Sequence, residues 1–474
     1  MIKIFSKLNC IKKLKSLYKQ NRFYIILFGT AIIGALCAFC IPLFIAEPFS
    51  VGDSIAALRQ AILAATGGIL AMLTLWETRR KNLQEKDKND LDHARQVKAE
   101  RRSRYAKAIE QLADDKSAVR LGGIYTLVKL ADEWLTDSKT TPDETDRMAE
   151  GQIIINILCS YIQSPYSLAG KRIFIEDTET FEESGDKFTN ERAALYTEQR
   201  IRQLIFNEIS KRSSKCNDSN EIKSGKWSIF EFNFTRSPIF YSLNDINLEN
   251  ANFSNSIFYG IANFRGSTFY GSTNFTGASF EEDAYFSNAT FRGRADFTEA
   301  FFKKYTDFIN VTFIEDALFN STVFDSNIFQ VNHASFHGAK FHGNTSFYKS
   351  VFNAQIHFNK ATFHKGVNFD NSCFEESPEF VNEKNIKESD SAGFSYKADP
   401  NDYSFRIDYS YPGSFDTVQI DAPGGISFRV PEGCILFDPN SWDEENQKYT
   451  IKIKPTPPLN MQYIIFYRMN RTFP

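Results

Sequence analysis

Phenylalanine recurs through the middle of this chain at steps that alternate between five and six residues. The chain holds 46 Phe among 474 residues, and half of them belong to this array. A sustained internal repeat constrains the architecture more than any other sequence feature, because every unit must fold in the same way. The array occupies positions 253, 258, 264, 269, 275, 280, 286, 291, 297, 302, 308, 313, 319 and 324, slips in register after Phe329, and resumes at 336, 341, 347, 352, 358, 363, 369, 374 and 380.

Most of these Phe residues follow a small residue two positions earlier, often with a polar residue between, as in ANF at 251–253 and ADF at 295–297. Alternation of inward and outward side chains is the period of a β-strand. Glycines such as Gly260 and Gly271 then mark corners. Three extended residues between corners are too few for the strands of a sandwich. The pattern therefore predicts a solenoid in which each unit forms one side and neighbouring coils lie about 4.8 Å apart.

These alternating A-[ND]-F and A-[TS]-F units resemble the pentapeptide-repeat family over residues 240–380. The resemblance implies a right-handed quadrilateral parallel β-helix with four units in each coil. Alternating steps of five and six give coils of 22 residues. We therefore expect a one-residue bulge or a wider corner on two sides of every coil. Leu243 and Leu248 are predicted to begin the first coil.

Two long apolar segments lie near the start of the chain, behind a basic segment at 1–22. Residues 23–46 carry no charge, and residues 55–76 are interrupted only by Arg59 and Gln60. Each segment is long enough to cross a bilayer core of about 30 Å as a helix. A secretory signal has a shorter apolar core, and the bulky residue before the first cysteine of the segment argues against a lipoprotein signal. We therefore predict transmembrane helices at 23–46 and 55–76.

The flanking charges predict the orientation of this hairpin. Residues 1–22 hold seven Lys or Arg and no acid, and the RRK run at 79–81 follows the second segment, whereas the turn carries Glu47 and Asp53. The positive-inside rule then places both termini in the cytoplasm. We expect a multi-pass protein of the inner (plasma) membrane of a bacterium, with the lipid bilayer as one partner.

Small residues four apart occur within both apolar segments, at Ala31/Ala35, Ala61/Ala65 and Ala64/Gly68. This spacing lets helix backbones approach closely. It fits packing within one hairpin and, alternatively, contacts between copies of the chain in a homo-oligomer. Arg59 lies one turn inside its segment, and one interpretation is that its side chain reaches out to the membrane interface. The alternative interpretation is that Arg59 places a charge on an ion pathway.

Residues 77–215 are predicted to form a helical stalk and a small helical domain. Residues 77–110 are densely charged and lack Pro and Gly, which predicts a solvated helix continuous with the second span. Apolar spacing predicts further helices at about 115–134, 146–163 and 190–212.

Local signals refine the first of these further helices. Asp115 is its candidate N-cap, and Gly122 and Gly123 indicate a close contact with another helix. Through the motifs A-I-x-Q-L and V-R-L-G-G-I-Y-x-L, residues 105–134 resemble the cytoplasmic helical segment of bacterial membrane-anchored pentapeptide-repeat proteins. The resemblance implies a HEAT-like helical pair and no chemistry.

Residues 395–474 leave the repeat and predict a β-rich domain between Pro, Gly and Asp turns. A compact domain here would cap the last coil, whose open edge would otherwise pair with other chains. A ligand-binding module is the alternative. The whole chain is thus predicted to be an α+β multidomain protein. The predicted strands of the last domain are 404–408, 417–421, 426–430, 448–454 and 462–467.

The residue types that carry catalysis and metal binding form no recognised pattern. Seven Cys are too few for a disulfide framework, and no nucleophile, zinc-protease or phosphate-loop motif occurs. His342 and His364 are 22 residues apart and are expected to stack on adjacent coils, with no third ligand near them. The other histidines of the array are His333, His337 and His357. We therefore predict no enzyme, no catalytic, cofactor-binding or metal residue, and no cofactor.

These features favour a scaffold that presents a rigid cytoplasmic solenoid to a protein partner. The alternative is a membrane-perturbing effector, in stress or phage defence, that the cytoplasmic domains gate. Some pentapeptide-repeat proteins mimic DNA and inhibit a topoisomerase. However, residues 240–380 hold 15 acidic and 9 basic residues, and a net charge of −6 is a weak field for such a mimic. Nucleic acid is therefore not an expected partner.

Overall fold

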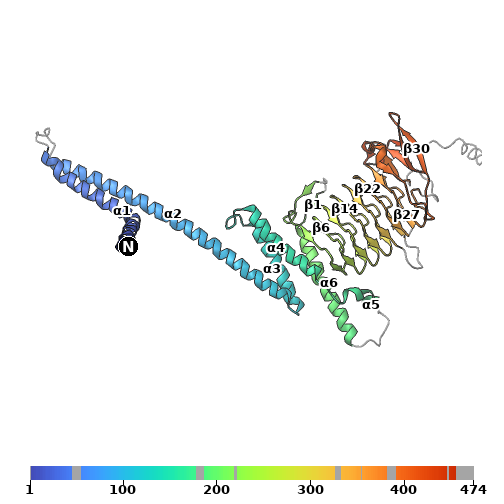
Figure 1. Cartoon of the computed structure of the whole chain (residues 1–474), viewed down its shortest axis with the longest axis horizontal. Coiled ribbons are helices and arrows are strands. Elements are labelled where there is room, and N and C mark those ends of the chain that lie inside the picture. The colour runs from blue at the N-terminus through green and yellow to red at the C-terminus, as the bar shows by residue number, and fades with distance from the viewer. Residues whose placement is uncertain are drawn as a thin grey trace, which may run out of the picture. The chain divides into compact units, whose positions relative to one another are not determined.

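The computed structural model describes residues 2–44, 55–177, 186–217, 221–325, 333–353, 355–381, 391–445 and 448–454 (Figure 1). The chain divides into two compact units, Met1–Glu100 and Arg101–Pro474. The predicted turn at 47–54, Phe329 and the predicted strand at 462–467 lie outside the described residues.

Two long helices begin the chain, α1 (Ile2–Phe44) and α2 (Ile55–Leu112). Arg22–Phe44 and α2 are long and apolar enough to cross a membrane. The predicted spans therefore lie on helices, apart from residues 45–46, which are not described. The predicted stalk is confirmed, since α2 continues without interruption to Leu112. The basic segment before the first span is also helical, which the sequence analysis did not predict.

The two helices of the hairpin are in close contact at Gly34. A Cβ on this residue would lie 2.2 Å from Cγ2 of Thr66, so only glycine fits. In contrast, Ala35, Ala64 and Gly68 are exposed, and a Cβ on Gly68 would meet nothing within 4 Å. The interpretation that these small residues pack the hairpin is therefore wrong, because the helices use Gly34 and Thr66 instead.

The helical domain consists of α3 (Ser117–Thr136), α4 (Glu144–Gln163), η1 (Ala169–Lys171), α5 (Arg172–Asp177) and α6 (Asp186–Arg212). Its core contains the predicted apolar residues Ile124, Leu127 and Leu158. The predicted helices are thus confirmed to within a few residues at their ends.

The N-terminal cap of α3 differs from the prediction. The cap residue is Lys116, and the carboxylate of Asp114 accepts the Lys116 N–H at 2.7 Å, so Asp115 does not cap. Gly123 does lie at a close helix contact, since a Cβ there would be 2.9 Å from the Ala108 carbonyl oxygen. Gly122 has nothing within 4 Å, and its predicted contact is wrong.

A parallel β-helix with four sides follows the helical domain (Figure 1). Side 1 consists of β3 (Phe232–Asn233), β6 (Ala251–Asn252), β10 (Thr273–Asn274), β14 (Ala295–Asp296), β18 (Ala317–Leu318), β22 (Thr345–Ser346), β26 (Val367–Asn368) and β29 (Tyr403–Ser404). Side 2 consists of β4 (Pro238–Ile239), β7 (Ile257–Phe258), β11 (Ser279–Phe280), β15 (Phe301–Phe302), β19 (Val323–Phe324), β23 (Val351–Phe352) and β27 (Cys373–Phe374). Side 3 consists of β8 (Ala262–Asn263), β12 (Ala284–Tyr285), β16 (Thr306–Asp307), β20 (His333–Ser335) and β24 (Gln355–His357). Side 4 consists of β5 (Asn247–Leu248), β9 (Thr268–Phe269), β13 (Thr290–Phe291), β17 (Thr312–Phe313), β21 (Lys340–Phe341), β25 (Thr362–Phe363), β28 (Gly393–Ser395), β32 (Ile435–Phe437) and the antiparallel β35 (Lys452–Ile453).

Inside the coils the Phe rings form four stacked columns, one behind each side. Phe286, which is fully buried, lies 5.1 Å from Phe264 and 4.7 Å from Phe308 between ring centroids, with nearly parallel planes. It also meets Phe297, of the column behind the opposite side, edge to face at 5.6 Å. Both geometries are favourable for aromatic pairs and add to the free energy of burial. The columns thus explain why Phe is the preferred interior residue of the repeat.

Two kinds of corner alternate around each coil. In the five-residue step after Phe286, the Ala289 N–H donates to the Phe286 carbonyl at 2.9 Å, and Asn288 adopts a φ of 58°. The six-residue steps use a wider corner, as predicted. At one wide corner, a Cβ on Gly293 would lie 2.6 Å from the carbonyl carbon of Gly271 in the adjacent coil. Glycine is required there by close contact between coils.

Regular coils place each residue beside the one 22 positions later, as with Ala262 and Ala284. The register slip is an insertion, since Thr306 pairs with Ala334, 28 positions later. The predicted start at residue 240 is wrong, because β3 at Phe232 already pairs with β6. Leu243 and Leu248 are buried in the first coil, as predicted, but the earlier part of that coil, with Phe234 and Ile239 in its interior, was missed.

Helices cover the first coil. Phe206 of α6 packs against Phe234, with the rings tilted by 36° and their centroids 4.6 Å apart, and thereby extends a Phe column by one ring. Side-chain amides of Gln163, Gln199 and Gln203 donate to the carbonyls of Asn233, Phe240 and Ser242 at 2.9–3.1 Å. These bonds satisfy backbone groups at an edge that would otherwise pair with another chain.

The β-rich region covers the other end. The solenoid continues beyond its predicted end at residue 380. β28 extends side 4 and β29 extends side 1, and the ring of Phe394 stacks on that of Phe363 with centroids 5.0 Å apart. Phe415 then lies 5.1 Å from Phe380 and 5.9 Å from Phe374, over the last rings. The remaining elements are the hairpins β30 (Thr417–Ala422)–β31 (Ile426–Pro431) and β33 (Trp442–Asp443)–β34 (Lys448–Tyr449), η3 (Pro400–Asp402), η4 (Pro439–Ser441), and the pair β1 (Lys215–Cys216)–β2 (Ile222–Lys223) beside the first coil.

Among the predicted C-terminal strands, two are confirmed as β30 and β31. The prediction at 448–454 corresponds to two short strands, β34 and β35. The strand predicted at 404–408 was assigned to the last domain, and this assignment is wrong. The strand found there, β29 at Tyr403–Ser404, belongs to the solenoid.

Candidate interaction site

Side 2 presents a largely apolar row of side chains to solvent. The first residue of each regular strand on this side is partly exposed, whereas the Phe that follows it is buried. Neighbouring coils at about 4.8 Å give the row a length of about 24 Å. The row consists of Ile257, Ser279, Phe301, Val323, Val351 and Cys373, each in register with the next.

Side 4 lies opposite side 2, because the four sides follow one another in order around each coil. Its outward row is hydroxyl-rich and contains one charge. The row consists of Thr268, Thr290, Thr312, Lys340 and Thr362. The same repeat therefore builds two opposite faces of different polarity.

Polar residues border the apolar row. Glu281 and Lys303 directly follow buried Phe residues of side 2 and form an ion pair between adjacent coils. Burial acts to raise the pKa of Glu281, but hydrogen bonds from Lys303 and Ser279 outweigh it and lower that pKa below its usual value. The carboxylate therefore stays charged. An apolar strip with a charged rim is the usual composition of a protein-binding surface.

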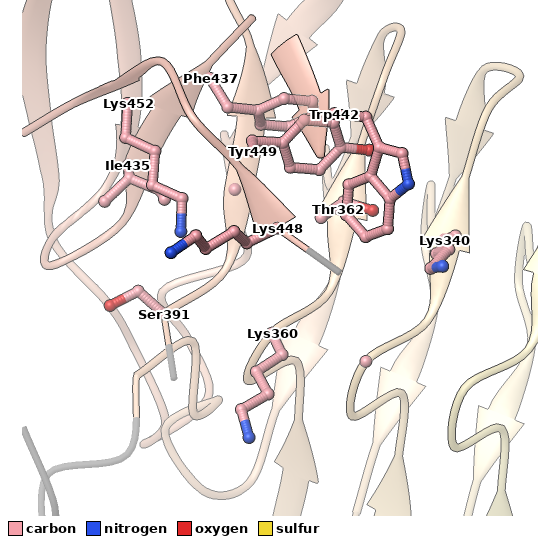
Figure 2. Close-up of a pocket in the computed structure, with 12 residues that line it drawn as sticks. Lys340, Lys360, Thr362, Ser391, Ile435, Phe437, Trp442, Lys448, Tyr449 and Lys452 are labelled. Carbon is pink, nitrogen blue, oxygen red and sulfur yellow. The ribbon is translucent and has the colours of Figure 1, made fainter. Parts of the chain in front are cut away.

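A pocket of about 240 Å³ lies where the β33–β34 hairpin meets side 4 (Figure 2). Its floor is the outward row of side 4, where Lys340, Thr362 and Gly393 are neighbours in register. Ile435 of β32 completes the floor. One wall is aromatic, with Phe437 and Tyr449 among its members.

The two stacked histidines lie beside this pocket. The rings of His342 and His364 are 4.2 Å apart between centroids, as predicted. The Tyr449 hydroxyl lies 2.9 Å from Nε2 of His364. Burial, followed by the proximity of His342 and Lys340, lowers the pKa of His364 to about 3. The ring of His364 is therefore neutral at physiological pH, and it packs against the aromatic wall of the pocket.

The remaining predicted residues lie apart from this pair. His357 contacts the Glu379 carboxylate through Nδ1 at 2.9 Å, and His337 lies in a corner. The side chain of His333 is outside the described part of the chain. Within the described residues, no group of three or more His, Cys, Asp or Glu is arranged to hold a metal ion.

Arg59 contacts the other helix of the hairpin. Its guanidinium carbon lies 5.7 Å from the centroid of the Phe39 ring, which is a cation–π geometry. Cation–π contact and snorkelling both lower the cost of a charge near the membrane interface.

The sequence analysis missed both the apolar row and the pocket. The row was readable, since Phe301 and Val323 occupy the position that polar residues fill elsewhere in the array. Lys340 was a partial signal for the pocket, because it interrupts a row of threonines. The hairpin residues Trp442 and Lys448 gave no signal, because they belong to no repeat.

Comparison with known families gives one match. Residues 253–300 and 330–372 match the family model described as pentapeptide repeats, with nine copies. Both matched segments lie within the span of the solenoid. The comparisons with curated proteins and with solved structures found no match.

Proposed function

We propose that this chain, a member of the pentapeptide-repeat family, is a non-enzymatic scaffold that two transmembrane helices anchor in the inner membrane of a bacterium. Its cytoplasmic solenoid binds a protein partner. The apolar row on side 2 is the observation that carries the proposal.

The row has the composition of a protein interface. Phe301, Val323 and Val351 lie next to one another on consecutive coils and are only partly buried. Burying apolar surface of this kind is the main driving force of association. The charged pair of Glu281 and Lys303 at its border would contribute to specificity more than to affinity.

The rigidity of the solenoid supports binding. Each outward side chain stands on a strand whose next residue is locked in a Phe column, as Phe301 is by Phe302, which stacks on Phe280 at 4.5 Å. A partner therefore meets a preformed surface and loses little free energy to ordering it. Both ends of the solenoid are covered, so its sheets are not free to pair end to end.

The charge distribution supports the membrane anchor and its orientation. Seven basic residues precede the first apolar helix, and the RRK run at 79–81 follows the apolar part of α2. The positive-inside rule then leaves the solenoid in the cytoplasm.

Proximity labelling from the C-terminus of the full chain tests the scaffold. We expect a discrete set of labelled proteins in cells that express the wild type. The double variant Phe301→Lys, Val323→Lys should lose that set, because two charges would be desolvated in the interface. The matched control is Thr290→Lys, Thr312→Lys, which adds the same charge to the opposite face. Equal labelling by both variants would exclude side 2 as the binding face.

The absence of catalysis is tested with the same purified chain. Pentapeptide-repeat proteins are typically structural or interaction proteins, which supports a role without catalysis. We expect no turnover on a panel of phosphate esters, peptides and nucleotides. Turnover that survives repeated purification would contradict the scaffold proposal.

The exposed small residues of α2 favour a second candidate, an effector that oligomerises and perturbs the membrane. Ala64 and Gly68 lie four residues apart and are not used within the hairpin. They would allow close packing against another copy. Overexpression with a membrane-potential dye separates the two functions. The effector predicts that the wild type depolarises the membrane and that the double variant Ala64→Leu, Gly68→Leu does not. The conservative control Ile69→Leu should depolarise it as the wild type does.

A further inference from the structure

The pocket between the β33–β34 hairpin and side 4 combines positive charge with aromatic surface. Four lysines line it, Lys340, Lys360, Lys448 and Lys452, and no acidic residue is among the described residues that do so. This is unusual in its setting, since residues 240–380 carry a net charge of −6. We infer that this pocket binds a nucleoside phosphate of mononucleotide size, which is a role separate from the proposed scaffold.

The floor of the pocket is kept open by one glycine. On side 4 the outward position is Thr or Lys in the preceding coils, but it is Gly393 beneath the hairpin. A Cβ on Gly393 would lie 3.0 Å from Cδ1 of Phe437 and would project into the space above the sheet. Loss of the side chain at this single coil creates the depression that the lysines surround.

The cationic side suits phosphate. Figure 2 shows Lys448, Lys452 and Lys360 on one side of the pocket, away from the aromatic rings. Lys448 and Lys452 come from the C-terminal strands, whereas Lys360 comes from a coil corner with a φ of 60°. Lysine ammonium groups bind phosphate oxygens as flexible point charges. Asp443 is opposite Lys448 in the hairpin but does not line the pocket.

The aromatic side suits a base. Tyr449 lies 4.8 Å from Trp442 and 4.2 Å from Phe437 between ring centroids, so the three rings form one cluster. Trp442 is half-buried and also carries the Lys340 ammonium 4.9 Å from its ring centroid. A nucleobase can stack on such a surface, as bases do on aromatic side chains in single-strand-binding proteins. An inorganic anion would leave this half of the pocket unused.

The size of the pocket selects a small ligand. Sites for drug-sized molecules occupy about 300–1,000 Å³. The volume of about 240 Å³ found here is below that range and fits one base with its sugar phosphate partly outside. A dinucleotide or a nucleic-acid strand would exceed it.

Calorimetric titration of the full chain in detergent micelles tests the inference. The ligands are AMP, GMP, CMP and UMP, and the matched partial ligands are adenosine, guanosine, ribose 5-phosphate and inorganic phosphate. We expect at least one mononucleotide to bind with a Kd below about 100 μM, and each of its parts to bind at least about tenfold more weakly. Affinity should fall as salt rises, because charge contributes to it.

Three variants locate the site. Lys448→Gln, Lys452→Gln should weaken the mononucleotide by at least about tenfold, and Trp442→Leu should weaken it similarly without changing the affinity for inorganic phosphate. Lys349→Gln is the control, since Lys349 is an exposed solenoid lysine outside the pocket. It should remain within about twofold of the wild type.

Several results would overturn the inference. They are no binding of any mononucleotide at about 1 mM, equal affinity for ribose 5-phosphate and the mononucleotide, or unchanged affinity in the lysine variant. The lysine variant is decisive even where Trp442→Leu unfolds the hairpin. Lys448 and Lys452 are exposed, so their replacement opens no cavity.

Discussion

The hydroxyl of Tyr449 lies 2.9 Å from Nε2 of His364, and this hydrogen bond joins the C-terminal hairpin to a regular coil of the solenoid. His364 in turn contacts the Phe437 ring edge to face at 5.2 Å. A neutral imidazole is thus enclosed among aromatic rings at the junction of cap and solenoid. Protonation would place an unpaired charge in this apolar site.

The pH dependence of the junction follows from this burial. The pKa of His364 is about 3 in the folded chain against 6.5 for the free side chain, so the unfolded chain binds more protons between these values. The contribution of His364 to stability is therefore complete above pH 6.5 and declines as the pH falls toward 3. His342 acts in the same direction, since burial and then Lys340 lower its pKa.

We expect hydrogen-exchange protection factors in β32 and β34 to decrease as the pH falls from 7.5 to 5. The double variant His342→Gln, His364→Gln lacks these two imidazoles, so its protection factors should change much less over this pH range. A decrease of equal size in this variant would mean that carboxylates, and not the two histidines, control the junction.

Replacement of one stacked ring should destabilise the coils around it. Phe286→Ala removes a fully buried ring from its column and is expected to cost about 3–5 kcal/mol of unfolding free energy. Phe301→Ala is the matched control, because Phe301 points outward and is only partly buried, and its loss should cost about 1 kcal/mol or less.

The damage from Phe286→Ala should remain near its own coil, because each coil of a solenoid contacts only its neighbours. Hydrogen exchange on the full chain measures this directly. Equal loss of protection from Phe253 to Phe380 would indicate one cooperative core and not stacked coils.

The corner at Asn288 is more sensitive than its exposure suggests. An exposed corner residue would normally tolerate alanine at well under about 1 kcal/mol. However, Asn288 has a φ of 58°, where an L-residue other than Asn or Asp is strained by about 1–2 kcal/mol. We therefore expect Asn288→Ala to destabilise by about 1 kcal/mol and Asn288→Gly to be close to the wild type. Equal stability of the two variants in urea unfolding would contradict a strained corner.

The sequence was sufficient to predict the parts of the fold that one residue type encodes at a fixed period. The alternation of Phe steps predicted the 22-residue coil, the wide corners and the stacking of His342 on His364. The sequence placed Leu243 and Leu248 in the first coil, but the start of that coil was missed because Ile239 fills its interior where later coils have Phe. No periodicity indicates a bond such as that between Gln163 and the Asn233 carbonyl, whose partners are 70 residues apart.

The binding features were predictable only in part, for the same reason. The apolar row is a property of the repeat, so its residues could be read at fixed positions. The pocket instead depends on where the β33–β34 hairpin folds back, and that places Lys448 near Lys340 although they are far apart in sequence. Only the interruption of the threonine row by Lys340 was visible beforehand.

The orientation of the hairpin is open to a direct test by fusion. The basic charges before the first span and at 79–81 predict that both termini are cytoplasmic and that the turn between the spans is external. Alkaline phosphatase, which folds only where disulfides form, should therefore be active when fused at Asp53 and inactive at Pro474.

A pair of charge-neutralising variants makes the topology test stricter. Replacement of the RRK run at 79–81 by three glutamines removes the positive charge behind the second span, whereas glutamines at Lys98, Arg102 and Lys107 remove the same charge more than about 20 residues beyond that span. Only charges close to the end of a span set orientation. The first variant should therefore raise phosphatase activity at Pro474, and the second should leave it unchanged. Activity at Pro474 in the wild type would contradict the cytoplasmic solenoid and, with it, the proposal that its partner is a cytoplasmic protein.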